Sequence, residues 1–305
     1  MKRNIFYRFG ITLICLSVSL FSYASRPIWV IGHGANYLGS AEAALNHGAN
    51  GVEIDVRAKE SYAKDHWSVD HKEYWTKDQC DKGEGRSYVF SLEKYLEQPI
   101  MNDPRMRVLW IDCKNEDYMV DLINLVHSLT PNGTPYSIIY GCYSAKTLEK
   151  YGTEIRKLLR DNEGINLGDK DISAVQPWIG NEPNKIPKEK HFYTRGYYRS
   201  SMKNKNHVID ARKLRDENNA FCTKVGFWTC DWMSEARICV DNEYAQAETN
   251  FDLVLAYYPE GLLPVATLRK WVLPDFVKGV VNDSKVNKGR WHIAGKGDKF
   301  WPTEK

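Results

Sequence analysis

Short apolar runs rich in β-branched residues recur along the chain, and three of them carry polar side chains at or near their carboxyl ends. These runs are 31–34, 52–56 and 110–114. Such runs are typical of strands that carry the polar side chains of a site at their ends. Strands that only form an apolar core would not have polar residues there. Glu53 and Asp55 lie two residues apart, so the period of a strand puts both carboxylates on one face. The pattern therefore predicts three strand ends that converge on one place.

These runs alternate with segments of helical periodicity. The expected strands are 28–31, 51–56, 107–111, 137–140, 165–167, 174–175, 192–197, 224–228 and 253–256, and the expected helices are 40–46, 91–97 with Ser91 as N-cap, 116–129, 144–159, 209–218, 233–242 and 262–271. About eight β–α units with near-continuous apolar strands predict a parallel sheet that closes as a TIM-type (β/α)8 barrel. The alternative is a doubly wound open sheet, but its first strand would be followed by a GxGxxG phosphate turn, and residues 32–36 read GHGAN.

The first 24 residues have the character of a secretory signal peptide. A basic start is followed by an apolar run over 9–21 and by Ser22-Tyr23-Ala24, a pattern that predicts cleavage after Ala24. The run is too short to span a bilayer comfortably. The remainder, 25–305, has no Gly/Ser linker, repeat or low-complexity segment. We therefore expect a secreted protein with one large domain.

The charge balance gives no indication of a nucleic-acid partner. The chain has 42 basic and 39 acidic residues, and loss of Lys2, Arg3 and Arg8 with the signal peptide leaves 39 of each. Without a basic excess or a block of like charge, binding to nucleic acid is not expected.

The cysteine content fits an exported protein. Of 7 cysteines, Cys15 leaves with the signal peptide, and the remaining even number allows disulfides. None forms a CxxC motif, which argues against zinc. Cys113 and Cys142 lie in expected strands and are interpreted as buried small hydrophobes. One disulfide is plausible within a group that is close in sequence: Cys222, Cys230 and Cys239.

The polar strand ends match the chemistry of an active site. In a (β/α)8 barrel the active site lies at the carboxyl ends of the strands, where His33, Glu53, Asp55 and Asp112 all fall. Neighbouring carboxylates raise each other's pKa unless a cation lies between them. Three carboxylates form an oxygen-rich set suited to a hard ion such as Mg²⁺. The three acids are therefore predicted ligands of Mg²⁺.

A second histidine and a lysine extend this hypothesis. His71 lies in the polar loop that follows strand 51–56, so it could share with His33 the work of base or nucleophile and of acid, because imidazole titrates near neutral pH. His66 is the alternative if the loop register is shifted. Lys114 follows the third acid by two residues and faces the same side, where its ammonium could hold a phosphate oxygen.

Motifs spread over nearly the whole mature chain resemble one known family. They are 31–33 (IGH), 48–55 (GANGVEID), 70–71 (DH), 112–114 (DCK), 139–143 (IYGCY), 193–198 (YTRGYY), 227–231 (FWTCD) and, more faintly, a C-terminal plug motif at 294–301 (AGKGDKFW). In this order and near these spacings, they are similar to the sphingomyelinase D/phospholipase D family of spider venoms and actinobacterial exotoxins. That family belongs to the glycerophosphodiester phosphodiesterase superfamily, and the resemblance implies its TIM-barrel fold.

Carried over residue by residue, the resemblance implies a role for individual positions. His33 and His71 correspond to the catalytic pair, Glu53, Asp55 and Asp112 to the Mg²⁺ ligands, Lys114 to a phosphate contact, and Trp228, together with Asp231, to the border of a choline pocket. The last assignment is physically reasonable, because the face of a tryptophan attracts a quaternary ammonium.

The function implied by the resemblance is that of a secreted, monomeric, Mg²⁺-dependent phospholipase D. It would act at a membrane surface and release choline from sphingomyelin or lysophosphatidylcholine, leaving a ceramide or lysolipid phosphate or its cyclic form. The alternatives are a glycerophosphodiester phosphodiesterase for small soluble diesters and a non-catalytic lipid-binding exotoxin. The spider enzymes carry a cysteine-rich loop after the second histidine, whereas this chain has only Cys80 there. The disulfide of that loop therefore cannot form in the same way.

Overall fold

The computed structural model describes residues 25–37, 39–82, 90–168, 172–196, 210, 213–218, 221–230, 253–257, 277–282, 284–287, 289 and 291–301. The predicted signal peptide, residues 1–24, and the expected helices 233–242 and 262–271 lie outside these ranges. Among the helices within them, none is both long and apolar enough to cross a bilayer.

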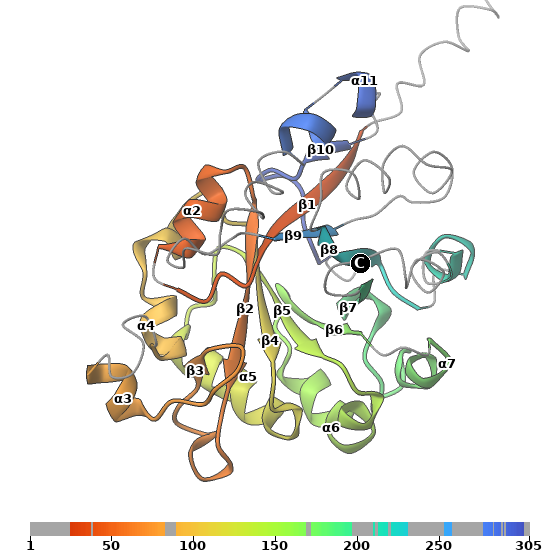
Figure 1. The fold of residues 1–305 in the computed structure, drawn as a ribbon. Helices are drawn as coiled ribbons and strands as arrows, with labels where there is room; N and C mark the ends of the chain where they lie inside the picture. Colours follow the sequence, from red (N-terminus) through yellow and green to blue (C-terminus); the bar gives the residue numbers. More distant parts are fainter. Residues whose placement is uncertain are drawn as a thin grey trace, which may run out of the picture.

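A closed parallel barrel forms the centre of the described structure (Figure 1). Its strands are β1 (Arg26–His33), β2 (Gly51–Arg57), β4 (Val108–Cys113), β5 (Ser137–Cys142), β6 (Glu163–Leu167), β7 (His191–Gly196), β8 (Lys224–Cys230) and β9 (Leu253–Tyr257). Each strand pairs in parallel with the next one along the chain, and β1 pairs with both β2 and β9. Because the sheet closes on itself, the TIM-type barrel is confirmed and the open doubly wound sheet is wrong.

Two short strands extend the barrel without entering its wall. β3 (Ser68–Val69) pairs antiparallel with the end of β2, and β10 (Trp291–Ile293) pairs in parallel with residues 26–28 at the start of β1. The two additions therefore lie at opposite ends of the barrel. β3 belongs to the carboxyl ends of the strands and β10 to the amino ends.

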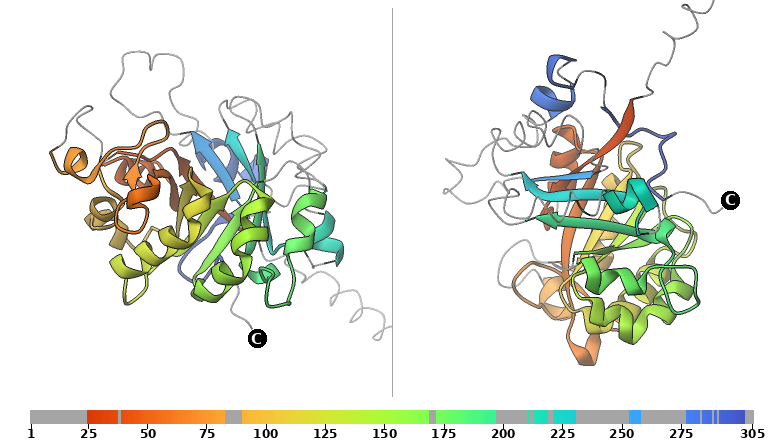
Figure 2. Two further views of the ribbon diagram at one scale, coloured as in Figure 1. Left: turned by 90° about the horizontal axis from the view of Figure 1, so that it is seen from below. Right: turned by 90° about the vertical axis from the view of Figure 1, so that its right-hand side faces the viewer.

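Helices cover the outside of the barrel (Figures 1 and 2). The α-helices are α2 (Ser40–Asn46), α3 (Lys77–Lys82), α4 (Leu92–Leu96), α5 (Met119–Leu129), α6 (Ala145–Leu158), α7 (Ile172–Val175) and α11 (Ser284–Asn287). Single turns of 3₁₀ helix span Glu60–Tyr62, Pro99–Asn102, Glu116–Tyr118, Gln176–Trp178 and Lys188–Lys190, and turns of π-helix span Leu214–Asn218 and Val277–Val281. The predicted N-cap of α4 is confirmed, because the Lys94 N–H donates to Ser91 Oγ at 3.2 Å.

Some expected elements differ from the structure. Residues 174–175, expected as a strand, end the helix α7. Val175 is buried there, and an apolar pair this short is buried equally well from a helical turn. The expected helix 116–129 is divided, because Glu116–Tyr118 form a 3₁₀ turn before α5 begins. Within the expected helix 209–218, the described residues include the π-turn Leu214–Asn218.

Large aromatic side chains fill the barrel at its amino end. Trp29 on β1 meets Phe300 edge to face at 5.1 Å between ring centroids, and Phe300 meets Phe192 on β7 at 5.5 Å. The indole N–H of Trp301 donates to the carbonyl of Ile138 at 3.0 Å, so the C-terminal segment 291–301 is fastened to the wall. Since this end is packed with rings, polar side chains in the barrel lie toward the carboxyl ends of the strands.

Candidate active site

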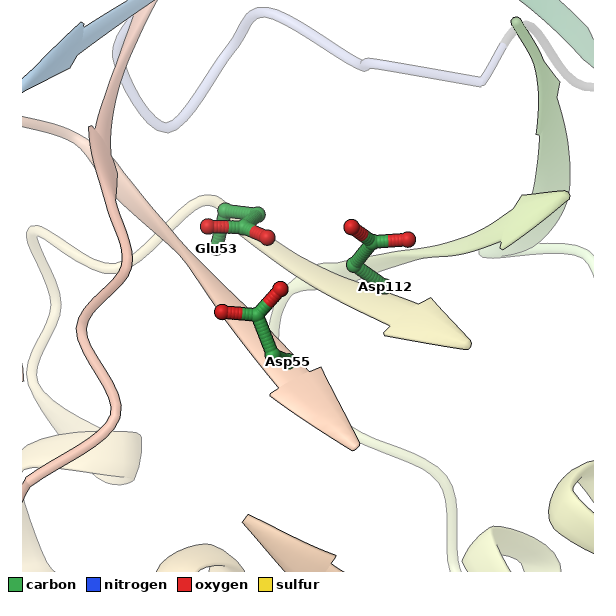
Figure 3. A group of neighbouring side chains, drawn as sticks. All are labelled: Glu53, Asp55 and Asp112. Carbon is green, nitrogen blue, oxygen red and sulfur yellow. The ribbon is translucent and has the colours of Figure 1, made fainter. Parts of the chain in front are cut away.

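Glu53, Asp55 and Asp112 form one compact group of carboxylates (Figure 3). One oxygen of each lies within 4.8 Å of the others, and each residue is only 2% exposed. Strand register explains this, because Asp55 on β2 is directly paired with Asp112 on β4 and Glu53 precedes Asp55 by one strand period. The structure therefore brings together the three acids that were predicted as metal ligands.

His33 lies beside this group at the end of β1. Its Nε2 atom is 3.7 Å from Glu53 Oε2. Burial lowers the pKa of His33 to about 4, so its imidazole is neutral at physiological pH. The backbone N–H of Gly34 donates to the same Glu53 oxygen at 2.6 Å, which holds the carboxylate against the strand end. The histidine can therefore accept a proton next to the acids.

The ammonium of Lys114 bridges two of the acids. Its Nζ atom lies 2.7 Å from Asp55 Oδ1 and 2.5 Å from Asp112 Oδ2. Burial alone would raise the pKa of Asp55. The charge of Lys114 and, to a smaller extent, that of His71 hold this pKa below its ordinary value. Lys114 therefore serves as a counter-ion of the acidic group. Its predicted contact with a phosphate stays a prediction.

One positive charge does not neutralise three carboxylates. Burial, together with the charges of Asp55 and Asp112, raises the pKa of Glu53 well above its ordinary value. Burial likewise raises the pKa of Asp112, whose Oδ1 atom is buried and accepts no hydrogen bond. A buried carboxylate oxygen without a donor is satisfied when a cation coordinates it. The residues present therefore fit a hard divalent ion.

Two residues that sequence reasoning missed orient the aspartates. The side-chain amide of Asn36 donates to Asp55 Oδ2 at 2.7 Å, and the Asp55 N–H donates back to Asn36 Oδ1 at 2.8 Å. The hydroxyl of Tyr143 donates to Asp112 Oδ2 at 2.6 Å. Both residues follow closely after the ends of β1 and β5. Their position after a strand end was the signal that could have identified them.

His71 lies at the rim, in the loop after β3. His71 is exposed, and the Arg57 guanidinium donates two hydrogen bonds to its backbone carbonyl, at 2.7 and 3.0 Å. Burial of His33 is the main cause of its low pKa, and the imidazole of His71 is among the groups that lower this pKa further. The two imidazoles are therefore close enough to interact electrostatically.

The alternative histidine, His66, is placed differently. It is buried beneath the same loop, where its Nε2 atom is 2.8 Å from the Trp75 carbonyl and 3.9 Å from Cys80 Sγ. The adjacent Trp67 is fully buried as well, and its indole N–H donates to the Ala63 carbonyl. These contacts give His66 and Trp67 a structural role.

The predicted choline-pocket residues are described only in part. Trp228 lies in β8 near its carboxyl end, paired with Gly196 of β7, so its backbone is at the same end of the barrel as the acids. Asp231 lies outside the described residues. Their role in binding choline stays a prediction.

The predicted burial of two cysteines is confirmed. Cys113 and Cys142 are buried thiols within β4 and β5, and neither forms a disulfide. Cys80 is also a buried thiol outside any disulfide. The expected pair among Cys222, Cys230 and Cys239 stays a prediction, because Cys239 lies outside the described residues.

Fold and site together define an α/β-barrel protein with the arrangement of an enzyme, in which a buried acidic group, a lysine and a neutral histidine meet at the carboxyl ends of the strands. The model of the Sphingomyelinase D/Phospholipase D family matches residues 23–225. This protein belongs to that family, whose name describes an enzyme activity.

Several known proteins are similar to this chain. A sphingomyelinase D of Trichophyton rubrum is 26% identical over 181 residues, which are 57% of this chain and 51% of the relative. The chain therefore spans about half the length of this relative. The dermonecrotic toxin LgSicTox-alphaIA1 of Loxosceles gaucho is 25% identical over 300 residues, covering 91% of this chain and 98% of the toxin. Among solved structures, a glycerophosphodiester phosphodiesterase from Agrobacterium tumefaciens matches 75% of this chain and 94% of its own at 16% identity, with a TM-score of 0.46.

Proposed function

We propose that this protein is a secreted, Mg²⁺-dependent phospholipase D that releases choline from sphingomyelin or lysophosphatidylcholine. The observation that supports the proposal most is the group of Glu53, Asp55 and Asp112, bridged by Lys114 and flanked by His33, in a member of this family. Secretion rests on the signal peptide predicted in residues 1–24.

Charge favours a divalent ion over a monovalent one. The three carboxylates carry three negative charges when ionised, and Lys114 neutralises one of them. A divalent ion would neutralise the other two, and a phosphodiester could then enter without repulsion. When bound, Mg²⁺ supplies electrostatic stabilisation of the negative charge that develops on the phosphoryl oxygens.

The two histidines divide the proton transfers. His33 is neutral, because burial holds its pKa at about 4, and it takes the proton of the attacking hydroxyl. That hydroxyl belongs to water or to the lipid itself, and the choice decides between a linear and a cyclic phosphate. As the bond from phosphorus to the choline oxygen breaks, His71 at the rim donates a proton to that oxygen. The ammonium of Lys114, which lies beside the acids, would contact a phosphate oxygen of the substrate.

The substrate test compares three choline phosphodiesters. Residues 25–305 are incubated with sphingomyelin vesicles, lysophosphatidylcholine or glycerophosphocholine, and phosphorus products are identified by ³¹P NMR. We expect new phosphate or cyclic phosphate signals from the lipids, together with free choline. Turnover of glycerophosphocholine alone would identify a phosphodiesterase for soluble diesters. Binding to vesicles without turnover would identify a lipid-binding exotoxin.

A pair of aspartate variants controls this test. D112N removes one charge from the acidic group and is expected to abolish turnover. D117N makes the same change at an exposed position, where the carboxylate is 79% exposed and pairs with Lys150 at 3.5 Å. Turnover in D117N should match the unmodified protein. Full turnover in D112N would contradict the proposal.

A further inference from the structure

The side chain of Tyr143 reaches the acidic group from the loop after β5. Its hydroxyl donates to Asp112 Oδ2 at 2.6 Å, and its ring lies 5.6 Å from Lys114 Nζ. The ring also lies beside Gly168, the residue directly after β6. A Cβ atom added to Gly168 would lie 3.0 Å from Tyr143 Cδ1. The tyrosine is therefore fixed both by its hydroxyl and by its ring.

The half-buried carboxylate of Glu116 fixes the backbone of the same loop. Glu116 accepts hydrogen bonds from the Tyr143 N–H at 2.5 Å, the Ser144 N–H at 3.1 Å and the Thr147 hydroxyl at 2.7 Å. Glu116 comes from the loop after β4, two residues beyond Lys114. The loops that carry Lys114 and Tyr143 are thus joined by one side chain, and they position their polar groups as a unit.

The two oxygens of Asp112 have different surroundings. Oδ2 accepts from the Tyr143 hydroxyl and from the Lys114 ammonium, whereas Oδ1 is buried and accepts no hydrogen bond. Two donors on one oxygen hold the carboxylate in a single orientation. Groups that hold a metal-binding carboxylate in this way govern metal affinity strongly, although they never touch the ion.

We propose that Tyr143 is a positioning residue of the metal site: Glu116 holds its backbone, Gly168 leaves room for its ring, and its hydroxyl orients Asp112 for a divalent ion. The inference rests on the proposed function, because it takes the acidic group to be a cation site. It predicts that loss of this one hydroxyl weakens metal binding without unfolding the barrel.

Mn²⁺ binding to residues 25–305, followed by electron paramagnetic resonance, tests this directly, because carboxylate sites for Mg²⁺ also accept Mn²⁺. Y143F should weaken Mn²⁺ binding by about 10- to 100-fold. The matched control is Y140F, which removes a hydroxyl from β5, the strand that leads into the loop of Tyr143. Tyr140 lies 3.5 Å from Glu163, away from the acidic group, so Y140F should bind Mn²⁺ like the unmodified protein.

A second variant displaces the Tyr143 ring without changing Tyr143 itself. Gly168 has no positive φ, so alanine fits its backbone, but the new methyl group would push the ring away. G168A should therefore also weaken Mn²⁺ binding, with an unfolding midpoint in urea close to that of the unmodified protein. Turnover in Y143F should recover at high Mg²⁺ concentration, since the defect is in metal affinity. A purely structural tyrosine would show no such recovery.

The outcomes separate the inference from the proposed function. Unchanged Mn²⁺ binding in Y143F would overturn the inference and leave a choline-releasing enzyme intact. Weakened binding in Y143F in a protein that releases no choline would support the inference and overturn the proposed function. Absence of Mn²⁺ binding in the unmodified protein would overturn both.

Discussion

Lys114 Nζ lies 2.7 Å from Asp55 Oδ1, although Asp55 lies near the end of β2 and Lys114 directly follows β4. The parallel pairing of β2 and β4 places Asp55 level with Asp112, and Lys114 follows Asp112 by two residues. The lysine side chain is 17% exposed and the aspartate side chain 3%. Removal of one partner of such a mostly buried ion pair strongly destabilises the folded protein, because the remaining charge stays buried without a counter-charge.

The first prediction concerns this ion pair. K114M leaves three buried carboxylates without a counter-ion and should lower the free energy of unfolding by about 3 to 5 kcal/mol in EDTA. Added Mg²⁺ should restore more stability to K114M than to the unmodified protein, because the ion then relieves more repulsion. Urea unfolding with and without Mg²⁺ measures both effects.

An exposed lysine provides the control for K114M. Lys82 pairs with Asp78 at 2.7 Å, but the two side chains are 55% and 68% exposed. K82M should therefore change the free energy of unfolding by about 1 kcal/mol or less. Equal effects of K114M and K82M would show that Lys114 is not a structural counter-ion.

The second prediction concerns His33. H33N removes the neutral imidazole beside Glu53 and should reduce turnover by about 100- to 10,000-fold, since a positioned base contributes that much. The side chain is 21% exposed, so the urea midpoint should change little. Choline release and urea unfolding are measured on the same preparation. A variant that unfolds would make His33 a structural residue.

The third prediction concerns metal removal. Excess EDTA should reduce choline release to background, and Mg²⁺ in excess over the chelator should restore it, because the acidic group otherwise repels the phosphodiester. Release is followed with the unmodified protein and sphingomyelin vesicles. Turnover that persists in EDTA would rule out the metal mechanism.

The fourth prediction concerns pH and a histidine distant from the acids. His191 is fully buried, its Nδ1 atom is 2.5 Å from the Phe221 carbonyl, and burial lowers its pKa to about 4. The ordinary value in the unfolded chain is 6.5. Between these pH values the unfolded chain binds a proton that the folded protein does not. Stability should therefore fall as the pH falls from 6.5 toward 4, by about 3 kcal/mol at most from this residue.

Urea unfolding at several pH values isolates the contribution of His191. H191N keeps an N–H donor near the position of Nδ1 but cannot titrate, so its stability should depend less on pH over this interval. The same pH dependence in H191N and in the unmodified protein would assign the effect to other groups.

Much of the barrel was predictable, because strand and helix periods are local properties. The helix Ser40–Asn46 has the bounds that its periodicity predicts, and Ser91 caps α4 as expected. Failures occurred where the local signal was short. Residues 174–175 could be a strand or a helical turn, and only their place in the core selected the helix α7.

The site divides in the same way. By itself the sequence determined that Glu53 and Asp55 share one face of a strand and that both precede a strand end, since a period of two residues requires no partner. Tertiary structure alone decided that Asp55 is level with Asp112, that Lys114 bridges them, and that Tyr143 and Asn36 orient them. These contacts join residues from different strands, so they depend on the register of a closed barrel, which no local pattern in the chain encodes.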